Sequence, residues 1–210
     1  MTDRKIVVPG ELLTDQRKKL GEHVFTDEGK LYADSLGLAE QDQDGVRVIP
    51  LQGRYMPQAE DLIVGIIARE EFSGYVVDIN SFYYSFVRKD NIRKPLEKGA
   101  VISAKITSVN EINEAELDQI RVFYDGEVLD VSPVKVPRII GKKGSMLEVL
   151  TKGTGSSIMA GRNGRVWIKD GNIALLKKAI KKIENEAHLS NLTVRITEFI
   201  EMEKKQALKG

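Results

Sequence analysis

The sequence predicts a multidomain α+β chain that contains a small β-rich N-terminal domain, a five-stranded β-barrel, a mixed α/β domain and a C-terminal helix. Three observations support this fold class. Five short apolar segments fall between residues 59 and 125, two closely spaced glycines separate two helical patterns near residue 141, and charge is divided unevenly along the chain. We expect domains over residues 1–58, 59–125 and 126–189, and a final helix over residues 190–210.

Composition describes a soluble globular chain, with 41% hydrophobic and 30% charged residues in a length of 210. There is no cysteine, which excludes disulfides and thiolate metal sites and fits a reducing compartment. The polar N-terminus does not lead into a signal peptide, and the strongest apolar run, residues 62–68, is too short to span a bilayer. We therefore expect a cytoplasmic protein that needs no cofactor and no metal.

The net charge of +1 hides two oppositely charged regions. Residues 1–132 carry 16 Lys and Arg against 24 Asp and Glu, a net charge of −8. Residues 133–189 carry 12 against 4, a net charge of +8. A basic domain on an acidic carrier indicates that nucleic-acid binding is concentrated in that domain, although such blocks can also be ordinary solvated faces.

The N-terminal 58 residues show short strand patterns over residues 30–33 and 46–51, with a turn at residues 27–29. Short strands at this spacing predict a small open sheet or half-barrel. A unit of this size buries little apolar surface and is marginally stable alone. We therefore expect it to dock on a neighbouring domain or on a partner.

Residues 59–125 are predicted to form an OB-type barrel. The five strands are expected over residues 62–68, 72–79, 82–87, 100–109 and 119–124. Barrels of this type bind single strands by stacking bases on aromatic rings beside cations. The candidate aromatic platforms are Phe72, Tyr75, Phe82, Tyr84 and Phe86. The candidate cations are Arg88, Lys89, Arg93 and Lys94. Because side chains alternate along a strand, about half of these rings are expected in the core instead.

The motif Gly141-Lys142-Lys143-Gly144 lies between a short helix pattern at residues 137–140 and a longer one that begins at Ser145. A strand pattern precedes them, and two strands and a helix follow, over residues 157–160, 165–168 and 173–187. This order is that of a KH domain, whose Gly-x-x-Gly loop clamps a single-stranded backbone across about four nucleotides.

The residue types of this loop suit a phosphate backbone. Glycine has no Cβ, so a backbone can lie against it, and Arg138, Lys142 and Lys143 place positive charge where the phosphates would pass. Trp167 alternates with Val166 and Ile168, so it is either a stacking platform or a packing residue of its strand.

Several strings in the sequence together resemble the RNA-binding cap subunits of the archaeal exosome, which consist of an N-terminal domain, an S1 domain and a KH domain. The resemblance covers almost the full length. The residues that carry it are Pro9-Gly10-Glu11, Val48–Pro57, Val76–Ser81, Ile139–Gly144 and Gly161–Ile168.

The resemblance implies a non-catalytic protein and identifies the barrel as an S1 domain. Three copies of such a cap subunit sit on a hexameric ring of RNase-PH-like subunits, and a second type of cap protein can replace some of them. The cap captures single-stranded RNA and passes its 3′ end into the ring for phosphorolysis. The N-terminal domain is the main contact with the ring, the S1 domains surround the pore, and the KH domains lie outside.

Two alternatives remain open from sequence. S1 and KH domains also occur in free-standing RNA-binding regulators and translation-associated factors. A nuclease would need a metal–carboxylate site or an acid–base pair. Glu70 and Glu71 are adjacent carboxylates, but we do not expect them beside a basic RNA site.

Overall fold

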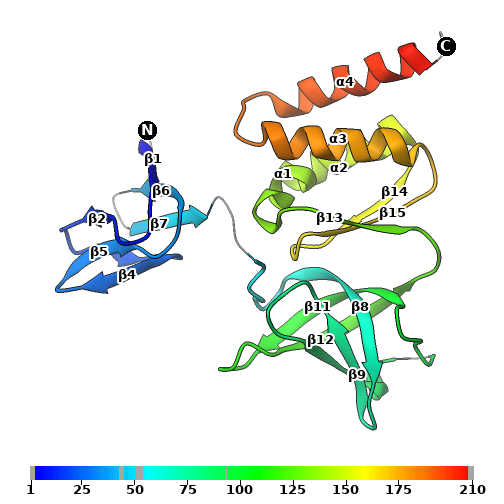
Figure 1. The fold of residues 1–210 in the computed structure, drawn as a ribbon, viewed down its shortest axis with the longest axis horizontal. Coiled ribbons are helices and arrows are strands. Elements are labelled where there is room, and N and C mark those ends of the chain that lie inside the picture. Colours follow the sequence, from blue (N-terminus) through cyan, green and yellow to red (C-terminus); the bar gives the residue numbers. More distant parts are fainter. Residues whose placement is uncertain (1–2, 43–44, 51–53, 93, 208–210) are drawn as a thin grey trace. The chain divides into compact units, whose positions relative to one another are not determined.

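A computed structural model describes residues 3–42, 45–50, 54–92 and 94–207. The chain divides into two compact units, residues 1–53 and residues 54–210 (Figure 1). The mixed α+β architecture predicted from the sequence is confirmed. No helix among the described residues is long and apolar enough to cross a membrane.

The first unit consists of two small sheets around a modest core. One sheet has the strand order β1-β6-β7-β3, from Asp3–Val7, Gly37–Gln41, Gly45–Pro50 and Lys19–Leu20. The other has the order β2-β5-β4, from Leu12–Thr14, Lys30–Ala33 and Val24–Asp27. The predicted turn at residues 27–29 connects β4 to β5, where Glu28 and Gly29 both have positive φ. The core cluster contains Val7, Val24, Leu31, Ala33, Val46 and Val48.

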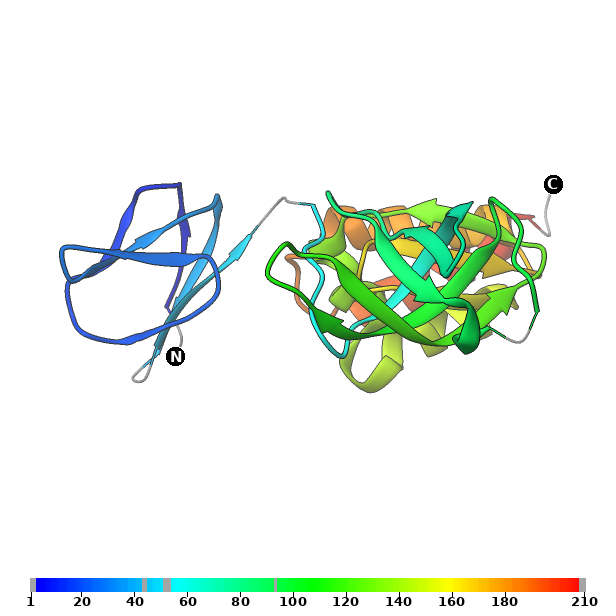
Figure 2. The same ribbon diagram turned by 90° about the horizontal axis from the view of Figure 1, so that it is seen from below.

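The second unit begins with a closed barrel in the order β10-β12-β11-β8-β9. Its strands are β8 Leu62–Glu70, β9 Gly74–Asp78, β10 Ser85–Arg88, β11 Val101–Val109 and β12 Ala115–Phe123. Strand β10 pairs parallel with β12 at a single register position, while the other pairs are antiparallel. In Figure 2 the barrel, coloured teal to green, lies in front of the helices of the same unit. The predicted inward residues of β11, Ile102, Ala104 and Ile106, are fully buried.

The boundaries of the predicted barrel strands differ most at the third strand. It begins at Ser85 rather than at residue 82, so Phe82 and Tyr84 lie in the loop between β9 and β10. The predicted fifth strand is longer than expected, because β12 begins at Ala115. Aromatic residues favour strands, and this preference led the prediction to extend β10 too far toward its N-terminus.

The basic domain has the order strand, helix, loop, helix, strand, strand, helix, as predicted. Its elements are β13 Glu127–Asp130, α1 Val136–Ile140, α2 Ser145–Thr154, β14 Ser157–Ala160, β15 Arg165–Lys169 and α3 Ile173–Glu186. The sheet order is β13-β15-β14. The predicted stripe of α3 is buried at Leu176, Ile180 and Ile183, because these positions share the face that packs on the core.

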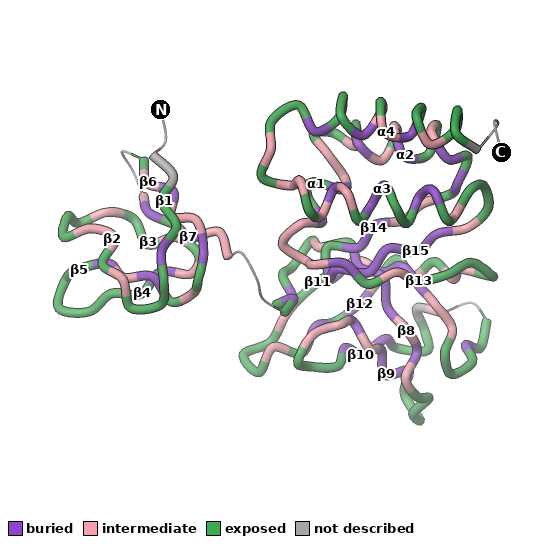
Figure 3. The backbone as a smooth tube through the Cα atoms, turned by 45° about the horizontal axis from the view of Figure 1, so that its top comes forward, coloured by how far each residue is buried: buried purple, intermediate pink, exposed green. Residues whose placement is uncertain are grey.

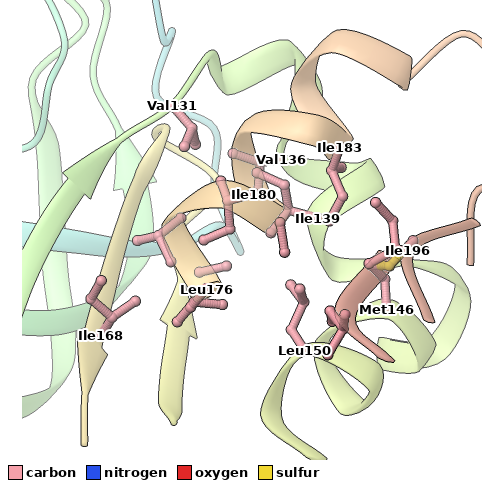
Figure 4. Packing of buried hydrophobic residues seen from close by; sticks show 14 of the residues in the cluster. Val131, Val136, Ile139, Met146, Leu150, Ile168, Leu176, Ile180, Ile183 and Ile196 are labelled. Atoms are coloured by element: carbon pink, nitrogen blue, oxygen red, sulfur yellow. The ribbon is translucent and has the colours of Figure 1, made fainter. Parts of the chain in front are cut away.

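A last helix, α4, runs over Leu192–Ala207 and joins the same core. Leu192, Ile196 and Ile200 are buried in a cluster shared with α2 and α3. Figure 4 shows Ile196 of α4 beside Met146 of α2. A Cβ added at Gly153 of α2 would lie 3.0 Å from the Ile200 side chain, so the two helices approach closely there. Figure 3 shows the buried stretches of this unit following β8, the β14–β15 hairpin and α3.

Candidate nucleic-acid interface

The Gly-x-x-Gly loop connects α1 directly to α2. Helix α1 ends at Ile140, where the Gly141 N–H donates to the Pro137 carbonyl at 2.9 Å. The loop then makes a single tight turn in which Lys143 and Gly144 have φ values of 54° and 82°. Its tip therefore projects Lys142 and Lys143 from a compact backbone rather than from a long loop.

The two glycines of the loop have different surroundings. A Cβ at Gly141 would lie 2.6 Å from the Met146 backbone nitrogen, so this position packs against the start of α2. A Cβ at Gly144 would meet nothing within 4 Å. Gly141 is therefore needed to close the loop, whereas the space beside Gly144 is open to a ligand backbone.

The predicted cations of this loop are exposed and available. Arg138, Lys142 and Lys143 are all exposed, and among the residues that the structure describes none of them has a carboxylate within ion-pair distance. By contrast, the α3 lysines Lys177 and Lys178 are paired with Glu127 and Glu203. The unpaired positive charge is thus placed on the loop rather than on the long helix.

The aromatic candidates of the barrel fall into two groups. Tyr75 is only 2% exposed, its ring belongs to the barrel core, and its hydroxyl accepts a hydrogen bond from the Leu96 N–H. A ring buried in this way cannot stack on a base, which corrects its assignment as a platform. Phe72, at the turn between β8 and β9, is fully exposed. Phe86 is half-buried in β10.

The loop before β10 carries three consecutive exposed aromatic residues, Phe82, Tyr83 and Tyr84. The guanidinium of Arg54 lies over the Phe82 ring, 4.7 Å from its centroid. Sequence reasoning missed Arg54 and Tyr83. The run of three aromatics was a usable signal for Tyr83, but Arg54 lies 28 positions earlier in the chain, and no local pattern connects it to Phe82.

Two of the four cations predicted beside the third strand form ion pairs. Arg88 pairs with Glu116 at 3.2 Å and Lys89 pairs with Glu70 at 2.7 Å. The Glu70 hydrogen bond raises the pKa of Lys89. Glu70 therefore does lie beside the basic segment, contrary to expectation. Lys94 is exposed, and Arg93 lies outside the described residues.

The turn between β14 and β15 fastens the barrel to the basic domain. Asn163 in this turn is fully buried, and its side-chain amide donates to the carbonyls of Val64 and Ile79 at 2.7 and 2.9 Å. The Arg162 N–H donates to the Leu62 carbonyl at 2.9 Å. These bonds join the KH sheet to the end of the barrel at β8.

A partly buried ion pair between Arg165 and Asp78 reinforces the same junction. Arg165 donates to the Asp78 carbonyl at 2.6 Å and to its carboxylate at 2.8 Å. Burial opposes ionisation of Asp78, but hydrogen bonds from Arg165 and from the Asn80 N–H outweigh it and lower the Asp78 pKa. Arg165 of β15 therefore connects the basic domain to Asp78 at the end of β9, and its side chain is not available to a ligand.

Trp167 is a packing residue and not a stacking platform. Its ring stacks on Phe123 of β12 with centroids 4.2 Å apart and an interplanar angle of 14°. Its indole N–H donates to the Asp125 carbonyl at 3.0 Å. The tryptophan thus covers the chain segment that leads from the barrel into the KH domain.

No group of three or more His, Cys, Asp or Glu side chains within the described part of the chain is arranged to hold a metal ion. The described side chains best placed to contact a ligand are the exposed cations of the KH loop and, separately, the exposed rings of the barrel.

Two family models match the chain. Residues 4–52 match the N-terminal domain of the exosome RNA-binding protein RRP4, and residues 126–174 match the KH domain. The second match confirms the domain inferred from the Gly-x-x-Gly loop and its order of elements. The first match covers a region in which the sequence analysis identified no candidate catalytic, binding or metal-ligating residue.

Relatives similar over nearly the whole chain carry the name exosome complex component Rrp4. The protein of Methanosarcina barkeri is 36% identical over 97% of this chain and 84% of its own length. That of Pyrococcus furiosus is 35% identical over 99% and 86%. A crystal structure described as that of an exosome complex RNA-binding protein is 33% identical, with a TM-score of 0.66, and covers 74% of this chain and 99% of its own.

Proposed function

The chain belongs to the Rrp4 family of exosome complex components, and we propose that it is a non-catalytic RNA-binding subunit of an archaeal exosome. In this proposal it captures single-stranded RNA and guides the 3′ end into a phosphorolytic ring of RNase-PH-like subunits. The observation that carries the RNA-binding part is the compact Gly-x-x-Gly loop, where Arg138, Lys142 and Lys143 are exposed and have no acidic partner among the described residues.

We propose that the domains at residues 1–58, 59–125 and 126–189 have different roles. The N-terminal domain docks on the ring, because large apolar side chains are exposed on this small unit. These residues are Ile6, Val8, Leu12, Leu20, Phe25 and Leu36. The barrel contributes Phe72, Phe82 and Tyr84 as stacking rings, and the KH loop contributes phosphate contacts.

Magnitudes favour action within an assembly. A KH loop that contacts three or four phosphates gives a salt slope of only about −2 to −3. Stacking adds roughly 1–3 kcal/mol per base. One copy should therefore bind weakly, and three copies around one pore raise the effective concentration enough to tighten capture by on the order of a hundredfold.

The site assignment is tested with the double variant Lys142→Asp and Lys143→Asp. The control is Lys204→Asp with Lys205→Asp, which makes the same change in charge on exposed residues at the end of α4. Affinity for a single-stranded RNA is measured against salt concentration. The loop variant should lose on the order of tenfold in affinity and about 1.4 of the salt slope, while the control changes little.

The assembly is tested by purifying the tagged chain gently from its host with RNase treatment and identifying its companions by mass spectrometry. RNase-PH-like subunits in roughly equal amount are expected, with both double variants as with the unaltered chain. Recovery of ribosomal proteins instead would replace this proposal with that of a translation-associated factor. Loss of ring association in the loop variant, with RNA binding intact, would contradict the site assignment.

A further inference from the structure

The KH loop lies at the edge of a groove of about 280 Å³. One side of the groove is formed by Arg138, Lys142 and Ser145, at the end of α1 and the start of α2. The opposite side is formed by Ser190 and Asn191, in the connection between α3 and α4, and by Thr193 in the first turn of α4. This connection lies outside the part of the chain that matches the KH family model, which ends at residue 174.

The lining of the groove is suited to an anion. It contains two cations and four hydroxyl- or amide-bearing side chains, and none of its lining residues is an aspartate or a glutamate. The nearest acidic residue before the connection, Glu186, is already bound by Lys182 at 2.6 Å and by Arg195 at 2.8 Å. Positive charge with several hydrogen-bond donors favours a ligand with charged, accepting oxygens, as in a phosphodiester.

The groove is continuous with the loop, because the loop residues Gly141 and Lys142 line it together with Arg138 of α1. A strand whose phosphates cross the Gly-x-x-Gly turn therefore reaches the groove without leaving the protein surface. The exposed polar side chains of the connection then face the strand from the side opposite the loop.

From this arrangement we propose that Ser190, Asn191 and Thr193 bind a phosphodiester of single-stranded RNA immediately beyond the nucleotides held by the KH loop. The segment leading into α4 is thus part of the RNA site. This inference rests on the proposed function, since it extends the path of the same strand.

The test compares Thr193→Asp with Val194→Asp in the full chain. Both residues are exposed and adjacent in the first turn of α4, where an acidic side chain is compatible with the helix. Only Thr193 lines the groove. Because the two residues are adjacent, the long-range effect of the added negative charge is about the same in both variants, and a difference in RNA affinity reports contact within the groove. Binding of a fluorescent single-stranded 12-nucleotide RNA is followed by anisotropy between 50 and 200 mM salt.

We expect Thr193→Asp to weaken binding about fivefold and to reduce the salt slope by about 0.7, the contribution of one phosphate on a single strand. Val194→Asp should stay within about twofold of the unaltered chain. A second variant, Asn191→Gly, removes the side-chain amide and retains the positive φ of 55° at this position, so it should weaken binding without unfolding the segment.

Amide chemical shifts separate this inference from the proposed function. RNA should perturb the amides of residues 190–193 together with those of residues 141–144. Equal affinities for the two Asp variants, or shifts confined to residues 141–144, would overturn the role of the connection and leave the KH proposal standing. Failure of the unaltered chain to bind RNA at all would overturn both.

Discussion

Asn163 and Val64, 99 residues apart in the sequence, are joined by a reciprocal pair of hydrogen bonds. The Asn163 side-chain NH2 donates to the Val64 carbonyl at 2.7 Å, and the Val64 N–H donates to the Asn163 side-chain oxygen at 3.1 Å. Strand β9 ends at Asp78, whose partner is Ile66, so Val64 lies beyond the β8–β9 ladder. The asparagine amide therefore completes the strand edge as a further backbone residue would.

Replacing Asn163 with alanine should destabilise the second unit by about 3 kcal/mol, because it leaves one N–H and two carbonyls buried without partners. Urea unfolding followed by circular dichroism measures the change. Arg162→Ala is the neighbouring control: its side chain is 47% exposed and makes only a 3.5 Å contact with Asp61. That change should cost under about 0.5 kcal/mol. Equal effects of the two substitutions would show that Asn163 does not fasten the junction.

Trp167 gives a spectroscopic probe of the same junction, because it is the only tryptophan in the chain. Its ring is 9% exposed and stacks on Phe123. Phe123→Ala should therefore shift the tryptophan emission to longer wavelength and lower the unfolding free energy by about 1–2 kcal/mol. Tyr124→Ala, which truncates the adjacent but 67% exposed ring, should leave the emission unchanged. An unshifted spectrum in the Phe123 variant would mean that this stacking does not shield the indole.

The spacing of apolar residues in the sequence correctly predicted the helices and strands that bury one face in a core. The α3 stripe at Leu176, Ile180 and Ile183, and the alternation of Ile102, Ala104 and Ile106 in β11, each follow from a repeat that matches one structure. The Gly-x-x-Gly loop was located because its neighbours are a recognisable order of strands and helices. Local patterns of this kind require no knowledge of distant contacts.

The remaining features depend on contacts between segments that are far apart in the sequence. The glycines around Asn163 predict a turn, but nothing local indicates that the turn enters the edge of the barrel. Tyr75 shares its side of β9 with Val77 and Ile79, and all three side chains are buried in the barrel core. Alternation groups these residues on one face, but which face of the strand is turned inward depends on how the barrel closes.

The two glycines of the KH loop should respond differently to alanine. At Gly141 a methyl group would meet the Met146 nitrogen at 2.6 Å in addition to the strain of positive φ, so Gly141→Ala should destabilise the domain by about 3 kcal/mol or more. At Gly144 only the φ of 82° opposes the change, with a cost of about 1–2 kcal/mol. Thermal or urea unfolding compares the two. A larger loss at Gly144 would contradict the contrast between a packed and an open position.

The pH dependence of stability should contain a contribution from Glu186. Hydrogen bonds from Arg195 and then Lys182 lower its pKa from 4.5 to about 2. Because the pKa is lower in the folded state, the stabilisation is present above about pH 4.5 and is lost as the pH falls toward 2. Glu186→Gln should therefore lower the melting temperature at pH 7, and the gap from the unaltered chain should close near pH 2.

Salt provides an independent check on this assignment, since these side chains are near the surface and are screened by ions. The gap caused by Glu186→Gln at pH 7 should shrink in 0.5 M NaCl. Glu201→Gln, at an exposed position of α4, serves as the control and should show little change with pH relative to the unaltered chain. A gap for the Glu186 variant that persists undiminished at pH 2 would mean that the side chain stabilises the α3–α4 corner through packing rather than through its charge.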